Sequence, residues 1–427
     1  MAQLLLRLLL LFAVLAHCIP TRLELVDEYT TFNGSLASRS LVKRDVYNDC
    51  DGPHANLLKK SIEDSNNIMA NMVAHLDLAI GLYQDDGSGE LRDDKRRRDQ
   101  RTFDENNAIL SYNMFIAKSY FGPGHASNKD GYNKLLGTRS LANFLSGQLK
   151  RYINGSPLFS GPDNLPLIRL HCSDADAYSE TDQEGRTYTQ ASGRIQPVKV
   201  NGNDIYYVNQ NVGGATFGTE ESYVWVPRLK VCDVGDGATT RLGGVPVDPG
   251  ISAYTYTDSA PLKEEIMVFC PASLGKWAAT ESERSASKVH YRDLHVEMGA
   301  QPTDAQIELA KSLKPGENDA ENISWLSSFM AQTVIHESTH SRALSGSRDV
   351  TLKDVYCKEN GVTTQTHTDP GCLQRIAKGD PGTLDENGKA QGHLDAQLFS
   401  MYAMAVYVNT ITWASGHRAK PRAVIMK

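Results

Sequence analysis

Apolar residues recur at helical spacing in several separate parts of the chain. After Cys50 they follow steps of three, four and seven and predict a long amphipathic helix, through Leu58, Ile62, Met69, Met72, Val73, Leu76 and Ile80. Further helices are expected at about 105–121, 141–152, 302–313, 322–344 and 394–412. The polar segment 84–101 contains a run of basic residues at 95–98 and is expected to be an exposed loop.

Residues 167–269, between the helical stretches, have the pattern of short strands. Apolar and aromatic runs at 206–208, 223–226 and 266–269 are bounded by Gly, Asn and Pro residues that favour turns. Helices, then strands, then helices again are typical of an α+β fold.

Length and composition narrow the class of protein. The 427 residues allow two or three domains of roughly 150 residues, or one large domain with insertions. Hydrophobic residues make up 40% and charged residues 22%, as in ordinary globular proteins. The net charge of -7 shows no basic excess that would indicate binding to nucleic acid or to an anionic membrane.

The first residues predict export. Arg7 precedes an apolar run at 8–16 that has the length of a signal peptide and is too short to span a bilayer, so residues 1–20 are expected to be removed. The dibasic pair Lys43 and Arg44 predicts a second cut, which makes 21–44 a propeptide of a zymogen. The mature chain, 45–427, is then expected to be secreted, with no later segment that could anchor it in a membrane.

Six cysteines remain after Cys18 is set aside with the signal peptide, and an even number predicts disulfides in an oxidising compartment. The favoured local pair is Cys357 with Cys372, although the sequence does not determine the connectivity. Glycosylation sequons at Asn154 and Asn322 agree with a secreted glycoprotein.

The segment His336-Glu337-Ser338-Thr339-His340 has the strongest chemical content. On a helix, His336 and His340 lie on one face and can bind one Zn²⁺ ion, while Glu337 is placed to act as the general base of a metalloprotease. By contrast, His290 and His295 are spaced by five residues and are expected at the surface.

A catalytic zinc ion usually has three protein ligands, so the pair of histidines needs a partner. The extended histidine motif fails, because Ala343 and Gly346 stand where it requires glycine and histidine. Glu359 is at a suitable distance along the chain, but its neighbours show no supporting pattern. Aspartates remain.

The chain resembles the fungal metalloendopeptidases called deuterolysins, or aspzincins, including the lysine-specific type. Their third ligand is an aspartate in an Asp-x-x-Tyr-Gly segment, and the stretch 352–357 is similar, which favours Asp354 as the ligand and Tyr356 as a residue that stabilises the oxyanion. Gly346–Asp349 resembles the alternative Gly-Thr-x-Asp form, which would make Asp349 the ligand. Tyr356 is one place early in the first match, and Leu352 replaces the tyrosine in the second.

The resemblance covers roughly 45–412, with insertions near 84–101 and 185–260. Residues 396–407 are similar to the family's C-terminal helix, Ala-Asp-x-Tyr-x-x-Tyr-Ala, except that Gln397 replaces its acid and Asp395 stands two residues earlier. The resemblance implies a zincin-like fold that is mainly helical, with a small antiparallel sheet and a β-rich insertion.

Two functions from different classes are expected to compete. The first is a monomeric, secreted zinc endopeptidase that acts on protein or peptide substrates. The second is a secreted zinc-binding or surface-interaction protein on a degenerate protease fold, which Gln397 and the spacing around Tyr356 favour. The presence of Glu337 favours the enzyme.

Overall fold

The structure is a computed structural model, and the part that it describes belongs to one unit of the chain. Contacts divide the chain into Met1–Arg44 and Asp45–Lys427, and the second unit carries everything below. The expected signal peptide, propeptide and helix at 105–121 lie outside the described residues, as does nearly all of the loop at 84–101. The described residues are 50, 52–81, 83, 88, 129–153, 167–174, 179–182, 184–193, 204–209, 223–228, 232, 240–242, 245–247, 251–256, 264–283, 289–297, 300, 302–312, 323–345, 351–359, 362–365, 372, 375–376, 392–412 and 420–421.

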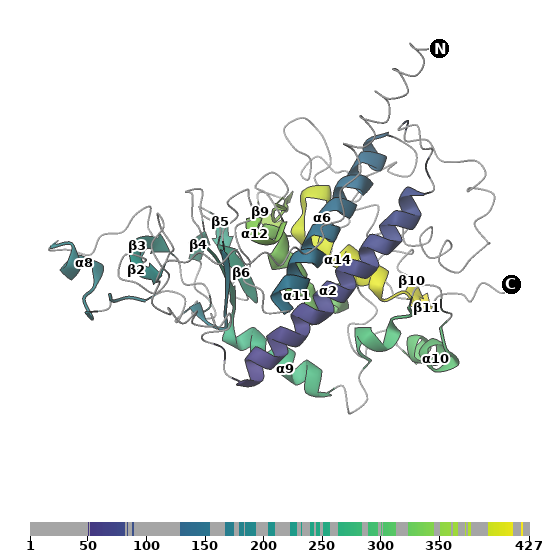
Figure 1. Cartoon of the computed structure of the whole chain (residues 1–427), viewed down its shortest axis with the longest axis horizontal. Helices are drawn as coiled ribbons and strands as arrows, with labels where there is room; N and C mark the ends of the chain where they lie inside the picture. Colours follow the sequence, from purple (N-terminus) through teal and green to yellow (C-terminus); the bar gives the residue numbers. More distant parts are fainter. Residues whose placement is uncertain are drawn as a thin grey trace, which may run out of the picture. The chain divides into compact units, whose positions relative to one another are not determined.

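Four helices contain much of the hydrophobic core (Figure 1). They are α2 (Gly52–Ile80), α6 (Lys129–Ile153), α11 (Met330–His340) and α14 (Ala396–Tyr407). Helix α2 packs against the other three, and α11 also packs against α14. The predicted apolar face of α2 is confirmed, since its buried residues include Leu58, Ile62, Met69, Met72 and Leu76.

Helix α6 is longer than the sequence pattern indicated. It begins at Lys129, twelve residues before the expected start at Leu141. Gly137 accounts for part of the error, because glycine is a weak helix former and reads as a break. In the structure a Cβ atom at Gly137 would meet nothing within 4 Å, and Leu135 beside it is fully buried. Burial of this face holds the first turns of the helix.

The central sheet is small and mixed. Its order is β1 (Leu167–His171), β7 (Glu264–Phe269) and β6 (Ala253–Tyr256). Strand β7 pairs in parallel with β1 and antiparallel with β6. The expectation of an antiparallel sheet is therefore wrong for β1, which is separated from β7 by a connection long enough for a parallel crossover.

The other described strands form two-stranded ribbons. Two ribbons lie in the expected β-rich part of the chain, and two more, after residue 350, were not expected. Their strands are β2 (Asp204–Asn209) with β3 (Tyr223–Arg228), β4 (Thr240–Leu242) with β5 (Val245–Val247), β8 (Tyr356–Glu359) with β9 (Val362–Gln365), and β10 (Ile411–Thr412) with β11 (Lys420–Pro421). The short helix α8 (Tyr188–Ala191) precedes β2.

The helical stretches of the second half are broken more often than predicted. The expected helix at 302–313 is confirmed as α10 (Asp304–Ser312), whereas α9 (Pro271–Glu283) was missed, although proline is favoured in a first helical turn. The stretch at 322–344 is divided into a 3₁₀ helix, η5 (Ile323–Ser328), then α11, then α12 (Arg342–Ser345). The last expected helix, at 394–412, is the shorter α14, preceded by the 3₁₀ turn η8 (Gly392–Leu394).

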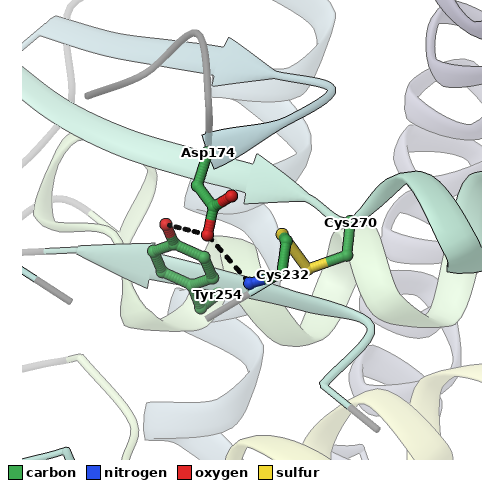
Figure 2. Close-up of a disulfide and its surroundings, with 4 residues drawn as sticks. All are labelled: Asp174, Cys232, Tyr254 and Cys270. Carbon is green, nitrogen blue, oxygen red and sulfur yellow. Dashed lines mark hydrogen bonds between the residues drawn. A yellow bond between two sulfur atoms is a disulfide. The ribbon is translucent and has the colours of Figure 1, made fainter. Parts of the chain in front are cut away.

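Two disulfides tie the sheet region to its surroundings. Cys50, just before α2, is bonded to Cys172, just after β1. Cys270, at the end of β7, is bonded to Cys232, whose backbone N–H donates a hydrogen bond to the buried carboxylate of Asp174 (Figure 2). Cys372 is disulfide-bonded as well. The side chain of Cys357, its expected partner, lies outside the described part, so that pairing stays a prediction.

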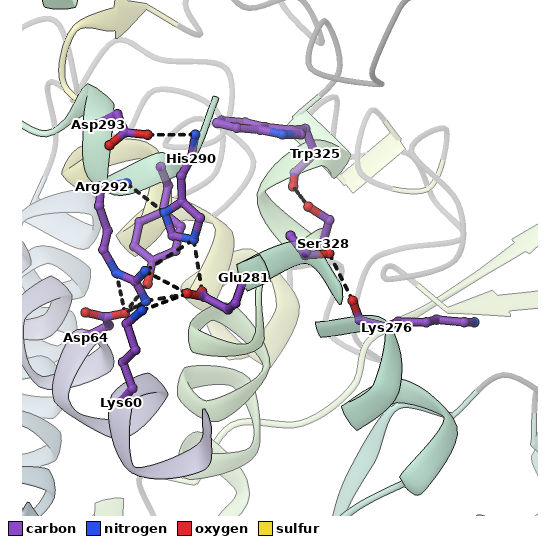
Figure 3. A network of polar contacts seen from close by, with 11 residues as sticks. Lys60, Asp64, Lys276, Glu281, His290, Arg292, Asp293, Trp325 and Ser328 are labelled. Atoms are coloured by element: carbon purple, nitrogen blue, oxygen red, sulfur yellow. Dashed lines mark hydrogen bonds and ion pairs between the residues drawn. The ribbon is translucent and has the colours of Figure 1, made fainter. Parts of the chain in front are cut away.

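A network of charges links α2, α9 and the 3₁₀ helix η4 (Tyr291–Leu294) (Figure 3). Arg292 pairs with Asp64 on α2 and with Glu281 on α9, and Lys60 reaches the same Glu281 carboxylate at 2.9 Å. Burial raises the pKa of Glu281, but hydrogen bonds from His290 and Arg292 outweigh burial and hold it well below its usual value. The carboxylate therefore stays charged.

The expectation that His290 is a surface residue is wrong. Its side chain is 2% exposed, and Nδ1 accepts a hydrogen bond from the backbone N–H of Arg292. Nε2 then carries the proton and donates to Glu281 at 3.0 Å. His295 is half-buried and stacks on Tyr407. The spacing of five residues correctly excludes a shared helical face, but it does not distinguish the surface from a buried polar network.

The described elements are mostly helical with one small mixed sheet, which agrees with the α+β class. None of the described helices combines the length and the apolar character that a membrane crossing needs.

We predict that all six cysteines from Cys50 onward are oxidised in the mature protein. Two disulfides account for four of them, and Cys372 is bonded too. Thiol titration of the denatured, unreduced protein should find about zero free thiols, and titration after reduction provides the control. Two free thiols in the unreduced sample would contradict the pairing of Cys357.

Candidate functional site

The segment that carries the two histidines is a helix buried on nearly every side. All residues of α11 from Met330 to Thr339 are buried, and only His340 at its end is partly exposed. Phe329 at the N-cap makes no side-chain capping bond, so burial against α2, α14 and β6 holds the helix in place of a cap. One helical turn separates His336 from His340, and their ring centroids are 4.9 Å apart.

Three electron-rich atoms converge beside this helix. Nε2 of His336 lies 3.2 Å from Nε2 of His340. Oδ1 of Asp354 lies 3.2 Å from the first nitrogen and 3.5 Å from the second. These three side chains form the group, among the described residues, that could hold a metal ion. The structure thus brings together the two histidines and the aspartate that the sequence favoured.

The hydrogen bond made by Nδ1 of each imidazole determines whether its Nε2 carries a lone pair or a proton. Nδ1 of His336 faces the amide oxygen Oε1 of Gln397 at 3.1 Å, and Nδ1 of His340 faces the backbone oxygen of Leu352 at 2.9 Å. Because both oxygens are acceptors, both Nδ1 atoms must donate. In the neutral rings, the facing Nε2 atoms are then lone-pair donors to a metal, which is the tautomer that metal ligands require.

Gln397 holds His336 through a chain of amides. Nε2 of Gln332, one turn before His336, donates to Oε1 of Gln397 at 2.9 Å and lies 2.6 Å from the hydroxyl of Ser400. In this arrangement Oε1 of Gln397 accepts from both Gln332 and His336. The glutamine that stands in place of an acid still makes the contact that orients the imidazole.

Electrostatics favours a positive charge at the point where the three atoms meet. Burial lowers the pKa of His340, but Asp354 outweighs burial and raises it to about 9; the pKa of His336 is raised for the same reason. Burial raises the pKa of Asp354, yet the two imidazoles hold it well below its usual value. Oδ1 of Asp354 is also shielded from solvent and makes no well-aligned hydrogen bond with a described residue. A bound cation would satisfy this buried oxygen.

Glu337 follows His336 and is 4% exposed. Its carboxylate oxygen Oε2 lies 2.8 Å from the hydroxyl of Thr255 on β6. Burial raises the pKa of Glu337, and the two neighbouring imidazoles oppose that rise. A carboxylate with a raised pKa beside a possible metal site is suited to accept and return a proton.

Asp354 is held in position by the start of α14. Lys353 forms an isolated bridge with Asp395, in which its N–H donates to Leu394 and its carbonyl accepts from Ala396. The fully buried carboxylate of Asp395 accepts from the N–H of Val355 at 2.9 Å and from the N–H of Leu398 at 2.6 Å. The same side chain therefore caps α14 and fixes the loop next to Asp354.

A buried carboxylate on β7 holds the turn after His340. Glu265 accepts hydrogen bonds from the hydroxyl of Ser341, from the backbone N–H and Nε of Arg342, and from the backbone N–H of Ala343. These bonds cap the N-terminus of α12 and explain why the chain leaves α11 at Ser341 with an extended backbone.

Some expected residues are not placed beside the site. Tyr356 begins β8, but its side chain lies outside the described part, as does that of Glu359. Asp349 lies in 346–350, which the structure does not describe.

Thr255 and Glu265 were not expected near the site, and Asp395 was expected near it without a defined role. Thr255 lies 82 residues before Glu337, and Glu265 lies 76 residues before Ser341, so each contact joins distant parts of the chain. No local motif marks them. Asp395 did carry a signal, since an aspartate three residues before Leu398 in an apolar run is a helix N-cap pattern.

Comparisons with protein-family models, with curated proteins and with solved structures match this chain to none of them.

We predict that Asp354→Ala loses most bound metal, comparably to His340→Ala. The substitution removes the oxygen of the three-atom group and leaves two neutral imidazoles. Asp349→Ala is the matched control and should keep the metal. Metal content per chain after dialysis checks both variants. The reverse result would transfer the role of ligand to Asp349.

We predict that Asp395→Asn weakens both metal binding and folding. An asparagine offers one acceptor oxygen in place of two, so either Val355 or Leu398 would face an amide NH₂ group. We expect metal affinity to fall by roughly 10–100-fold and the free energy of unfolding to fall by about 1–3 kcal/mol. Competition with a chromogenic chelator and urea unfolding measure the two effects.

Asp304→Asn, at an exposed position in the first turn of α10, is the control for this second substitution. It should change neither quantity appreciably. Unchanged metal affinity in Asp395→Asn would show that the loop keeps Asp354 in place without this clamp.

Proposed function

We propose that this protein is a zinc-dependent endopeptidase of the deuterolysin type. The observation that carries the proposal is the convergence of His336, His340 and Asp354, with both imidazoles held in the ligand tautomer and a buried Glu337 on the same helix. Two imidazole nitrogens and one carboxylate oxygen, with a fourth position left for water, are a donor set typical of catalytic zinc.

The spacing of the three donor atoms supports zinc over a larger ion. Ligands about 2.0–2.1 Å from a tetrahedral Zn²⁺ ion are separated from one another by about 3.3–3.4 Å. The observed separations are 3.2, 3.2 and 3.5 Å. Calcium and magnesium prefer sites made of oxygen atoms and would not select two imidazoles.

In the proposed reaction each residue has a separate task. His336, His340 and Asp354 would hold the ion, which when bound would supply Lewis-acid polarisation of the scissile carbonyl and of the attacking water. Glu337 accepts a proton from that water on its carboxylate and later returns it to the leaving amine. By its resemblance to the family, Tyr356 would donate a hydrogen bond to the developing oxyanion.

The wider proposal follows from the resemblance and from the disulfides. A zincin-like fold would explain a motif helix packed between a helical core and a small sheet, as α11 is between α14 and β6. Disulfide-bonded cysteines are typical of secreted proteins. We therefore propose a secreted, monomeric enzyme, made as a zymogen and cut after Arg44, with proteins or peptides as substrates.

The alternative is a secreted zinc-binding protein without hydrolytic activity. Gln397 favours it, because an amide stands where the resembled family has an acid. Two observations oppose it: the amide oxygen still orients His336, and Glu337 is retained with a hydrogen-bonded carboxylate. A degenerate site has no reason to retain a buried carboxylate beside the donor group, since a buried acid costs free energy.

We predict that the mature protein binds one zinc ion per chain and hydrolyses casein in a chelator-sensitive manner. Glu337→Gln should keep the zinc and lose hydrolysis by roughly 10²–10⁴-fold, because it removes the proton acceptor and no metal ligand. Glu308→Gln, exposed on α10, is the matched control and should behave as wild type. Zinc bound without chelator-sensitive hydrolysis would establish the alternative function.

A further inference from the structure

Thr255 lies in β6, and its side chain contacts Glu337 near the middle of α11, the helix that carries His336 and His340. Its hydroxyl oxygen is 2.8 Å from Oε2 of Glu337 and 3.0 Å from the backbone oxygen of the same residue. Strand β6 is at the edge of the described three-stranded sheet and contacts α11 (Figure 1). Through this hydrogen bond the sheet directly contacts the side chain of Glu337, which we propose as the proton acceptor.

The register of the sheet directs Thr255 toward the helix. Thr255 pairs with Met267 on β7, so these two side chains lie on the same face of the sheet. Glu265, two residues from Met267, lies on that face too and bonds to Ser341 at the end of α11. The face that carries Thr255 is therefore the face against which the motif helix is fixed.

The hydroxyl restricts the carboxylate in a specific way. A threonine hydroxyl has one proton to donate, and both acceptors belong to Glu337. Donation to Oε2, the nearer acceptor, ties the end of the Glu337 side chain to strand β6 and restricts its rotation. Among the described contacts, Oε1 accepts no hydrogen bond. That oxygen stays available to an attacking water.

We propose that Thr255 is a positioning residue that orients the Glu337 carboxylate for proton transfer. This inference rests on the proposed hydrolytic function and deepens it. Oε2 is the oxygen that is held, and Oε1 is the oxygen that takes the proton from water. A β-branched residue in a strand has few side-chain rotamers, which makes threonine well suited to hold an acceptor at a fixed place.

A purely structural role would give a different result from a positioning role. If Thr255 only anchored the strand to the helix, its loss would lower stability and would leave the turnover of the folded enzyme unchanged. If it orients Glu337, its loss lowers kcat in a protein that is still folded and loaded with zinc. Zinc binding is unaffected in that case, because both hydrogen-bond acceptors of the hydroxyl belong to Glu337 and not to the proposed ligands of the ion.

The test compares Thr255→Val, Thr255→Ser and wild type, each with one zinc ion per chain, on a quenched fluorogenic peptide that wild type cleaves. Valine keeps the shape and removes the hydroxyl, whereas serine keeps the hydroxyl. We expect Thr255→Val to lower kcat by roughly 10–100-fold, as a small misplacement of a reacting group does. KM should stay within about twofold, and Thr255→Ser should recover most of kcat.

Thr410→Val is the matched control. Thr410 is buried, whereas Thr255 is half-buried, and the hydroxyl of Thr410 donates to the backbone oxygen of Leu294 in another segment at 2.8 Å. Its loss should lower the melting temperature and leave kcat unchanged. Thr255→Val with wild-type kcat, or with a loss of zinc that accounts for its lower activity, would overturn the inference while leaving the proposed function intact. A wild-type protein without chelator-sensitive cleavage would overturn both.

Discussion

Two imidazole nitrogens that face each other at 3.2 Å, with a carboxylate oxygen beside them, would repel one another in their unprotonated forms unless a positive charge lies between them. The surrounding structure enforces this arrangement. His336 is held by the amide of Gln397 and His340 by the carbonyl of Leu352, so neither ring can turn its lone pair away without losing a hydrogen bond. Asp354 is held in turn by the clamp at Asp395. The fold therefore holds three electron-rich atoms at one point, where a positive charge, carried by a proton or by a metal cation, is stabilised.

The side chains around the three donor atoms differ in charge, and their total charge would affect how strongly a bound ion acts as a Lewis acid. Gln397 and Gln332 orient His336 without adding a charge, while Asp354 and Glu337 each bring one negative charge. A doubly charged ion would then be neutralised by these two groups. An acid at position 397 would add a third negative charge and make the ion a weaker Lewis acid. In the proposed enzyme, the amide would keep the orientation that an acid supplies while leaving the ion more electrophilic.

The sequence allowed local features to be predicted and left distant contacts hidden. The two histidines could be placed on one face because a helix relates residues four apart by geometry alone. Asp354 required a resemblance, since no rule of spacing connects a loop to a helix. Thr255 and Glu265 come from strands more than seventy residues away, and their register is set by tertiary pairing. The same limit explains why 322–344 was expected as one helix. Glu265 stabilises the end of α11 at Ser341, and no residue close to 341 in the sequence predicts that the helix ends there.

The contacts between the sheet and α11 depend on the pairing register of β6 and β7. Pairing of Thr255 with Met267 places Thr255 and Glu265 on the face toward α11, one at the middle of the helix and one at its end. Tyr254 and Val268, one position along, lie on the opposite face, where the hydroxyl of Tyr254 is 3.5 Å from Asp174. Asp174 also accepts from Cys232, which is bonded to Cys270 at the end of β7 (Figure 2). A slip of one residue would turn both sets of side chains to the wrong face. The disulfide and the buried carboxylate therefore secure, from behind the sheet, the register on which the geometry of the site in front depends.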